Sequence, residues 1–279
     1  MHWSEALVDR SLPSSRPAIG AMATLLALLA QQPTAQATPA VELLSHRAAY
    51  RLSLAQADSG SGITQVRGAL VLEWRADCDG WLTQQRMGFV ADADDGPGFS
   101  YDVRFSSWES RDNTELRFNT RTFDGDKLQE EFRGQAKLDA PGGAGTVRYS
   151  IPDGQTEELP AGTIFPTAHV GDLIAAAEAG EHLVNREVFD GSGEDALSKA
   201  TAVIGSAKTV PLPGGGEERR WPVSIAYFAA AGDDALPQFE IAFDLSPGGV
   251  LNDLRLNYGD FTLKADLETL QTYAQPVCK

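Results

Sequence analysis

Hydrophobic and polar residues alternate with a period of two through most of the chain. Such alternation is typical of antiparallel strands that bury one face and expose the other. It runs through residues 48–54, 66–74, 81–89, 101–105, 116–118, 128–132, 147–151, 184–189, 200–204, 223–228, 239–245, 251–258 and 261–270. Turn signals at Asp124-Gly125 and Pro247-Gly248 separate neighbouring runs. We therefore predict an all-β protein with roughly 12 to 14 strands.

One segment has the period of a helix instead. It follows Pro166, where Thr167 is suited to cap a helix N-terminus, and it ends at Gly180, which supplies a stop signal. Apolar residues recur at helical spacing at Val170, Leu173, Ile174 and Ala177. We predict one inserted helix over residues 167–179, with this apolar stripe packed on the sheet.

The first 37 residues have the features of a secretory signal peptide. Arg10 and Arg16 precede an apolar core over residues 18–30, and Ala35-Gln36-Ala37 resembles a cleavage site. The core is shorter than the ~20 apolar residues that span a bilayer. We expect cleavage after Ala37, which leaves residues 38–279 as a single domain.

The chain contains two cysteines, Cys78 and Cys278. An exported chain meets an oxidising environment, in which a lone pair of cysteines usually forms a disulfide. We therefore predict that a bond between these residues joins an early segment to the C-terminal end of the chain.

The formal net charge of the chain is −16. Nucleic acids and anionic membrane surfaces require clustered Lys and Arg residues, so this charge argues against both as partners. We also expect no transmembrane segment after the leader, because no later stretch is long and apolar enough.

The residue pattern shows no catalytic or metal-binding motif. Three histidines follow the leader, His46, His169 and His182, and we assign them structural roles because further metal ligands at suitable spacing are missing. The chain also has no nucleophile elbow, no phosphate-binding glycine loop and no His-Glu-x-x-His motif. Acidic residues are too abundant for any one pair to indicate glycoside hydrolysis. We predict a non-enzymatic protein without a cofactor.

A Pro-x-Gly-x-x-Phe-Pro-Thr-x-His stretch is the most distinctive motif. Its fixed positions are Pro160, Gly162, Phe165, Pro166, Thr167 and His169. Together with residues 188–192, the exported leader and the C-terminal cysteine, it resembles the EipB-like cell envelope integrity family of alphaproteobacteria. The resemblance covers roughly residues 45–279.

The resemblance implies a periplasmic protein that maintains the cell envelope. It implies a β-spiral, which is one strongly curved antiparallel sheet similar to that of bacterial lipoprotein carriers, and a disulfide between Cys78 and Cys278. It also implies contact with a periplasmic tetratricopeptide-repeat protein and carries no catalytic residue. Two alternatives remain: a carrier of lipid or lipoprotein on the concave sheet face, and a secreted hydrolase.

The motif has a physical interpretation of its own. Pro166 favours an extended Phe165, which could staple the start of the helix to the sheet, while Thr167 caps the helix. His169, in the first turn, is expected to hydrogen-bond a neighbouring strand. The motif therefore marks either the architecture around a helix that plugs the sheet or a binding site.

Overall fold

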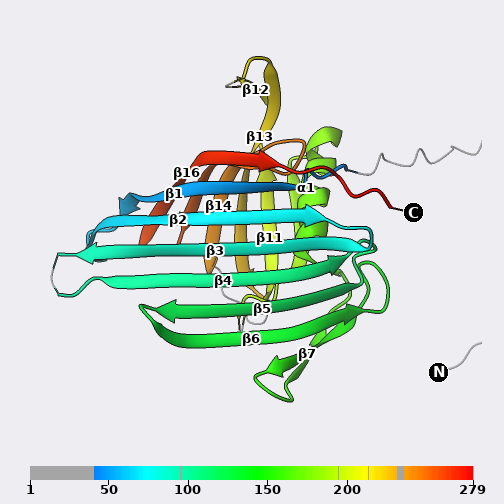
Figure 1. Ribbon diagram of the computed structural model, residues 1–279, viewed down its shortest axis with the longest axis horizontal. Coiled ribbons are helices and arrows are strands. Elements are labelled where there is room, and N and C mark those ends of the chain that lie inside the picture. Colours follow the sequence, from blue (N-terminus) through cyan, green and yellow to red (C-terminus); the bar gives the residue numbers. More distant parts are fainter. Residues whose placement is uncertain (1–40, 95, 194, 213, 231–235, 279) are drawn as a thin grey trace, which may run out of the picture. The chain divides into compact units, whose positions relative to one another are not determined.

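The computed structural model describes residues 41–94, 96–193, 195–212, 214–230 and 236–278 (Figure 1). The predicted signal peptide and its cleavage site lie outside these residues. Within them the chain forms one α-helix, α1 (Pro166–Ala179), and sixteen strands. The strands are β1 (His46–Ala57), β2 (Ile63–Ala76), β3 (Gly80–Ala93), β4 (Phe99–Ser110), β5 (Glu115–Asp124), β6 (Lys127–Leu138), β7 (Gly145–Ile151), β8 (Thr156–Leu159), β9 (Thr163–Ile164), β10 (Leu183–Phe189), β11 (Leu197–Ile204), β12 (Lys208–Pro211), β13 (Glu217–Ala229), β14 (Phe239–Leu245), β15 (Leu251–Asn257) and β16 (Phe261–Thr272).

The sheet is antiparallel except at one edge. Its order is β8-β7-β6-β5-β4-β3-β2-β1-β16-β15-β14-β13-β11-β10-β9, and β12 pairs with β13 beside this path. Strand β9 alone runs parallel to its neighbour, β10. The structure has more strands than the pattern predicts because β8, β9 and β12 are two to four residues long. Strands this short are too brief to show alternation.

The two ends of the sheet are joined by three residues. Strands β8 and β9 are consecutive in the chain, yet they occupy opposite ends of the strand order. Residues 160–162 connect them, and the N–H of Gly162 donates to the carbonyl oxygen of Gly142 at 2.8 Å. Gly162 has φ +99°, which favours glycine. The sheet is therefore strongly curved and nearly closed, and the predicted fold class is confirmed (Figure 1).

Two apolar clusters fill the inside of the curve. The larger cluster combines inward side chains of β1–β3, β10–β11 and β13–β16 with the apolar face of α1. The smaller cluster consists of Leu116, Phe118, Phe132, Ala136, Leu138, Val147, Tyr149, Leu159, Phe165, Phe189 and Ala196. Helix α1 buries Leu173, Ile174 and Ala177 and packs the partly buried Val170 against the larger cluster, as predicted. It ends at Gly180, whose φ of 75° is left-handed.

Candidate functional site

A cavity lies between helix α1 and the inner face of the curved sheet. Its volume is about 320 Å³. Apolar side chains from β2, β4, β10 and β13–β15 form most of the wall, among them Leu72, Val103, Val188, Ile225 and Phe243. The helix contributes Pro166, Thr167, His169, Val170 and Leu173. The cavity is therefore apolar over most of its surface, with polar groups near the start of the helix and on β3 and β5, where Thr83, Gln85 and Thr120 belong to the wall.

Two buried nitrogen atoms, on side chains of the cavity wall, have no hydrogen-bond partner among the described residues. They are Nε1 of Trp74 and Nε2 of His169, and both side chains belong to the cavity wall. The prediction that His169 hydrogen-bonds a neighbouring strand is wrong for the described part of the chain. Burial without a partner is costly for a polar atom, so a ligand group that hydrogen-bonds these nitrogens would be stabilised.

The imidazole of His169 is neutral at physiological pH. Burial lowers the pKa of His169 to about 4, while the charge of Asp172 raises it and that of Arg186 lowers it. A neutral imidazole has one N–H donor and one acceptor nitrogen. His169 can therefore accommodate either a donor or an acceptor on a ligand, whereas Trp74 can only donate.

The N-terminus of helix α1 is capped by the side chain of a residue on a strand and not by a residue at the start of the helix itself. The carboxylate of Glu109, on β4, accepts hydrogen bonds from the backbone N–H groups of Thr167 at 2.9 Å and Ala168 at 3.1 Å. Phe165 occupies the N-cap position without a side-chain cap, and Pro166 comes first in the helix. The prediction that Thr167 is the cap is therefore wrong, because the helix begins one residue earlier than its sequence signal indicates.

The capping carboxylate has an unusual environment. Burial raises the pKa of Glu109 to about 7, although hydrogen bonds from Thr167 and Ala168 favour its charged form. Only 3% of the residue is exposed. The sequence did contain a signal for this site, because Glu109 continues the inward positions of the strand that contains Tyr101, Val103 and Phe105. An acidic residue at such a position requires a polar partner.

A second carboxylate, that of the half-buried Asp190, belongs to the cavity wall. Burial raises its pKa, while hydrogen bonding with Ser192 lowers it, and its Oδ1 accepts the N–H of Ser192 at 2.8 Å. No hydrogen bond joins Asp190 to His169 among the described residues, so these groups do not form a nucleophile–base–acid relay. The described residues also contain no group of three side chains suited to hold a metal ion.

The motif residues divide between two places. Pro160 and Gly162 lie in the connection between β8 and β9, away from the cavity wall. Phe165 is fully buried in the smaller apolar cluster, and its N–H donates to Oδ1 of Asn113 at 3.2 Å. Pro166, Thr167 and His169 belong to the cavity wall. One half of the motif thus closes the sheet, and the other half forms part of the candidate site.

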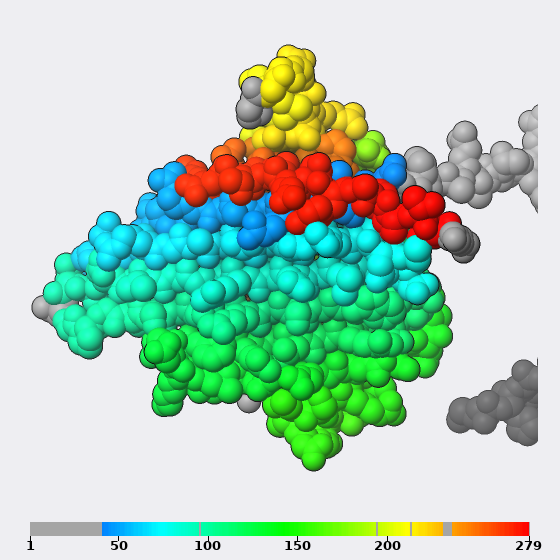
Figure 2. All heavy atoms as spheres, viewed as in Figure 1, coloured from blue at the N-terminus to red at the C-terminus, as the bar shows by residue number. Residues whose placement is uncertain are grey.

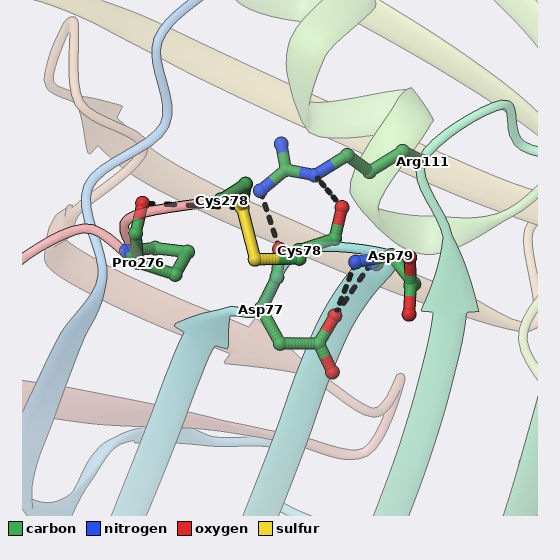
Figure 3. The surroundings of a disulfide bond; sticks show 7 residues. Asp77, Cys78, Asp79, Arg111, Pro276 and Cys278 are labelled. Carbon is green, nitrogen blue, oxygen red and sulfur yellow. Dashed lines mark hydrogen bonds between the residues drawn. A yellow bond between two sulfur atoms is a disulfide. The ribbon is translucent and has the colours of Figure 1, made fainter.

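The disulfide lies at a different place from the cavity. Cys78, in the turn between β2 and β3, is bonded to Cys278 in the C-terminal segment, with their Cα atoms 5.4 Å apart (Figure 3). This is the pair that the sequence predicts. Arg111 supports the turn, because its Nε donates to the carbonyl oxygen of Cys78 at 3.0 Å. The bond therefore fixes the segment after β16 to the rim of the sheet.

No helix in the described part of the chain is long and apolar enough to cross a membrane. The chain has clear counterparts among known proteins. The chain is 36% identical over 248 residues to "Cell envelope integrity protein EipB" of Brucella abortus (strain 2308), which covers 86% of this chain and 88% of that protein.

A solved structure supports the same relationship. The crystal structure of a "Beta-barrel-like Protein of Domain of Unknown Function DUF1849" from Brucella abortus aligns with a TM-score of 0.78 and 36% identity. The alignment covers 84% of this chain and all of that one. The EipB-like family model matches residues 37–274. The chain therefore belongs to the EipB-like family, and its likeness to the Brucella protein connects it with cell envelope integrity.

Proposed function

We propose that this protein maintains the cell envelope from the periplasm by binding and not by catalysis. The cavity against α1 is its ligand site. The observation that carries the proposal is the combination of apolar walls with two buried nitrogens, Nε1 of Trp74 and Nε2 of His169, that find no partner in the described part of the chain. An amphipathic molecule satisfies both parts of such a site.

The size of the cavity limits the ligand. Ligand pockets usually measure about 300–1,000 Å³, so a volume of about 320 Å³ lies at the small end of this range. A single acyl chain with a carbonyl or carboxyl end fits the chemistry, because its chain contacts apolar walls and its oxygen accepts from Trp74. We therefore favour one lipid or lipoprotein acyl chain as the cargo over a complete multi-chain lipid.

Two features support the absence of catalysis. The carboxylates of Glu109 and Asp190 are engaged with backbone N–H groups, and only Asp190 belongs to the cavity wall. No described serine or cysteine lies in hydrogen-bond contact with His169, which a nucleophilic mechanism would require. The related Brucella protein is named for envelope integrity.

Contact with a periplasmic tetratricopeptide-repeat protein is the second part of the proposal and rests on the family resemblance. One surface feature favours a protein contact. Leu183 on β10 and Val203 on β11 stand directly opposite each other, and each is more than half exposed. Exposed apolar residues that adjoin each other are a common mark of interaction surfaces.

A fatty-acid probe tests the ligand site. Binding of 11-(dansylamino)undecanoic acid should enhance its fluorescence with the wild-type protein, and Val103→Trp should abolish the enhancement by filling the cavity. The matched control is Val90→Trp on the outer face of β3, where the residue is 48% exposed. Equal probe binding by the two variants would contradict the cavity as the site.

The protein contact is tested separately. Affinity capture from periplasmic extract should recover a tetratricopeptide-repeat protein with the wild-type chain. The double variant Leu183→Glu with Val203→Glu should recover much less of it, whereas Leu128→Glu, at an exposed position on β6, should behave as wild type. Undiminished capture by the double variant would show that this pair is not the contact.

A further inference from the structure

The outer face of strands β3–β6 carries side chains in rows that cross the sheet. Strand register aligns one basic row and one mainly polar row beside it. The basic row is Arg86, Arg104 and Arg121, followed by Glu131, and the polar row is Gln84, Ser106 and Asn119, followed by Arg133. These side chains point outward, because inward neighbours such as Phe118 and Phe132 belong to the smaller apolar cluster.

Two adjoining hollows lie along these rows. Their volumes are about 440 Å³ and 660 Å³, and Gln84, Ser106 and Asn119 belong to the walls of both. Short side chains in the polar row leave this space, and arginines border it. We call the combined hollow the arginine trough and define it by these three residues with Arg86, Arg104, Arg121, Arg133 and Arg148. Figure 2 looks onto the outer face of these strands.

The arginine trough has an excess of positive charge in a chain whose formal net charge is −16. Asp102 is shared by two arginines, at 2.9 Å from Arg86 and 2.7 Å from Arg104. Glu131 is shared in the same way, at 2.9 Å from Arg121 and 3.2 Å from Arg133. Each carboxylate therefore neutralises only one of its two partners.

Arg148 adds a further charge to the trough. It has no carboxylate within ion-pair distance among the described residues, whereas Arg86, Arg104, Arg121 and Arg133 do. Arg117, which also borders the trough, is paired with Glu115 at 2.6 Å and stacks over Trp108 at 4.8 Å. The trough therefore has an excess of positive charge. Because guanidinium groups bind carboxylate and phosphate through paired hydrogen bonds, this excess favours an anionic ligand.

The floor of the trough needs a hydrogen-bond donor. The side-chain oxygen Oδ1 of Asn119 is buried and has no partner among the described residues. Ser106 is its neighbour in the row, and Gln84 follows on the next strand. A bare anion cannot donate to this oxygen, whereas a ligand hydroxyl can. The complementary ligand therefore carries both anionic groups and hydroxyl groups, and its length extends over both hollows.

We infer that the arginine trough binds a linear anionic glycan. An anionic membrane surface would face more of the chain than the trough, and the formal net charge of −16 opposes its approach. An extended acidic peptide binds sheets by adding to an edge, but β3–β6 are paired on both sides and offer only side chains. This inference is independent of the cavity against α1 and its cargo.

Direct titration with defined probes tests the inference. Oligogalacturonate, a linear carboxylated saccharide, should bind the full mature chain, and its affinity should fall as salt rises. Neutral maltooligosaccharide of similar length should bind at least about tenfold more weakly. Tighter binding of poly-L-glutamate or of anionic phospholipid vesicles than of oligogalacturonate would overturn the inference, and so would an absence of oligogalacturonate binding.

Paired variants locate the site. Arg133→Gln combined with Arg148→Gln should weaken oligogalacturonate binding at least about tenfold. The control is Arg51→Gln combined with Arg67→Gln, which removes the same charge from exposed arginines of β1 and β2 outside the trough. Equal weakening by both pairs would overturn the inference, because it would reflect net charge alone. Melting temperatures close to wild type confirm that both pairs are folded.

Discussion

The carboxylate of Glu109 accepts the backbone N–H of Thr167 at 2.9 Å and thereby joins strand β4 to the start of helix α1. The helix has no side-chain cap of its own, so this contact satisfies amide groups that would otherwise be buried without partners. It also holds the helix against the sheet at the side where Thr167 and His169 enter the cavity wall. The geometry of the ligand site therefore depends on a residue outside the cavity wall.

Glu109 should make the stability of the protein depend on pH. Its pKa is about 7 in the folded protein, compared with an ordinary value of 4.5. The folded protein therefore retains a proton that the unfolded chain releases, and this contribution to the free energy of unfolding falls as pH rises from 4.5 to about 7. The decrease amounts to about 3 kcal/mol. Denaturant unfolding of Glu109→Gln should lack this decrease.

The control for Glu109 is an exposed glutamate. Glu217→Gln on β13 should retain the pH dependence of the wild type. Buried histidines change the free energy of unfolding with pH in the opposite direction. The lowered pKa of His169 makes stability fall as pH drops from 6.5 to about 4. The difference between wild type and Glu109→Gln is therefore the quantity to measure. A constant difference between pH 4.5 and 7 would contradict the buried state of Glu109.

Two substitutions in α1 should have opposite effects on stability. Leu173→Asp introduces a charge at a site that is 1% exposed, so it should lower the free energy of unfolding by more than about 3 kcal/mol. Gly171→Ala should raise it by about 1 kcal/mol, because a Cβ at Gly171 meets no atom within 4 Å and alanine favours helix. Unfolding in urea measures both. An unchanged stability of Leu173→Asp would show that the helix is not packed on the sheet.

Much of this architecture could be predicted from alternation. Along β1, Tyr50 and Leu52 are buried, whereas Arg47 and Arg51, at the alternate positions, are exposed. This is the pattern of a strand with one buried face. Closure of the sheet could not be predicted in the same way. It depends on β9, which has two residues, and on a backbone contact between Gly162 and Gly142.

The candidate sites were harder to infer because they are assembled from distant segments. The cavity combines residues from Leu72 on β2 to Leu251 on β15, and no local pattern links them. The motif did include His169, but only the packing shows that the described residues offer its Nε2 no partner. The net charge of −16 likewise gave no indication of the arginine trough. A sum over the whole chain cannot show that the strand register places several arginines next to one another on one face.

The disulfide should stabilise the folded chain. Loop-entropy arithmetic for a separation of 200 residues gives about 5 kcal/mol as an upper value, because the bond restricts the unfolded chain. Cys278→Ser should therefore lower the denaturant midpoint and leave the far-ultraviolet spectrum of the sheet intact. Cys78→Ser and the double variant should lose the same amount of stability as Cys278→Ser, since all three variants lack the same disulfide. Two reactive thiols in the unreduced, unfolded wild type would contradict the pairing.

The purified protein should show no turnover of ester, glycan or peptide substrates. The reason is that the carboxylates of Glu109 and Asp190 are committed to backbone contacts and that no described nucleophile adjoins His169. Release of a chromogenic product measures this for each class. A hydrolytic activity that disappears on substitution of Glu109 or Asp190 by its amide would favour the hydrolase alternative.

The central claim is that an amphipathic ligand in the cavity is required to maintain the envelope, and survival in detergent tests it most directly. Cells that lack the protein should become sensitive to detergent, and expression of Val90→Trp should restore resistance. Expression of Val103→Trp at equal abundance should leave the cells sensitive, because the indole occupies the cavity. Full restoration of resistance by folded Val103→Trp would contradict the claim.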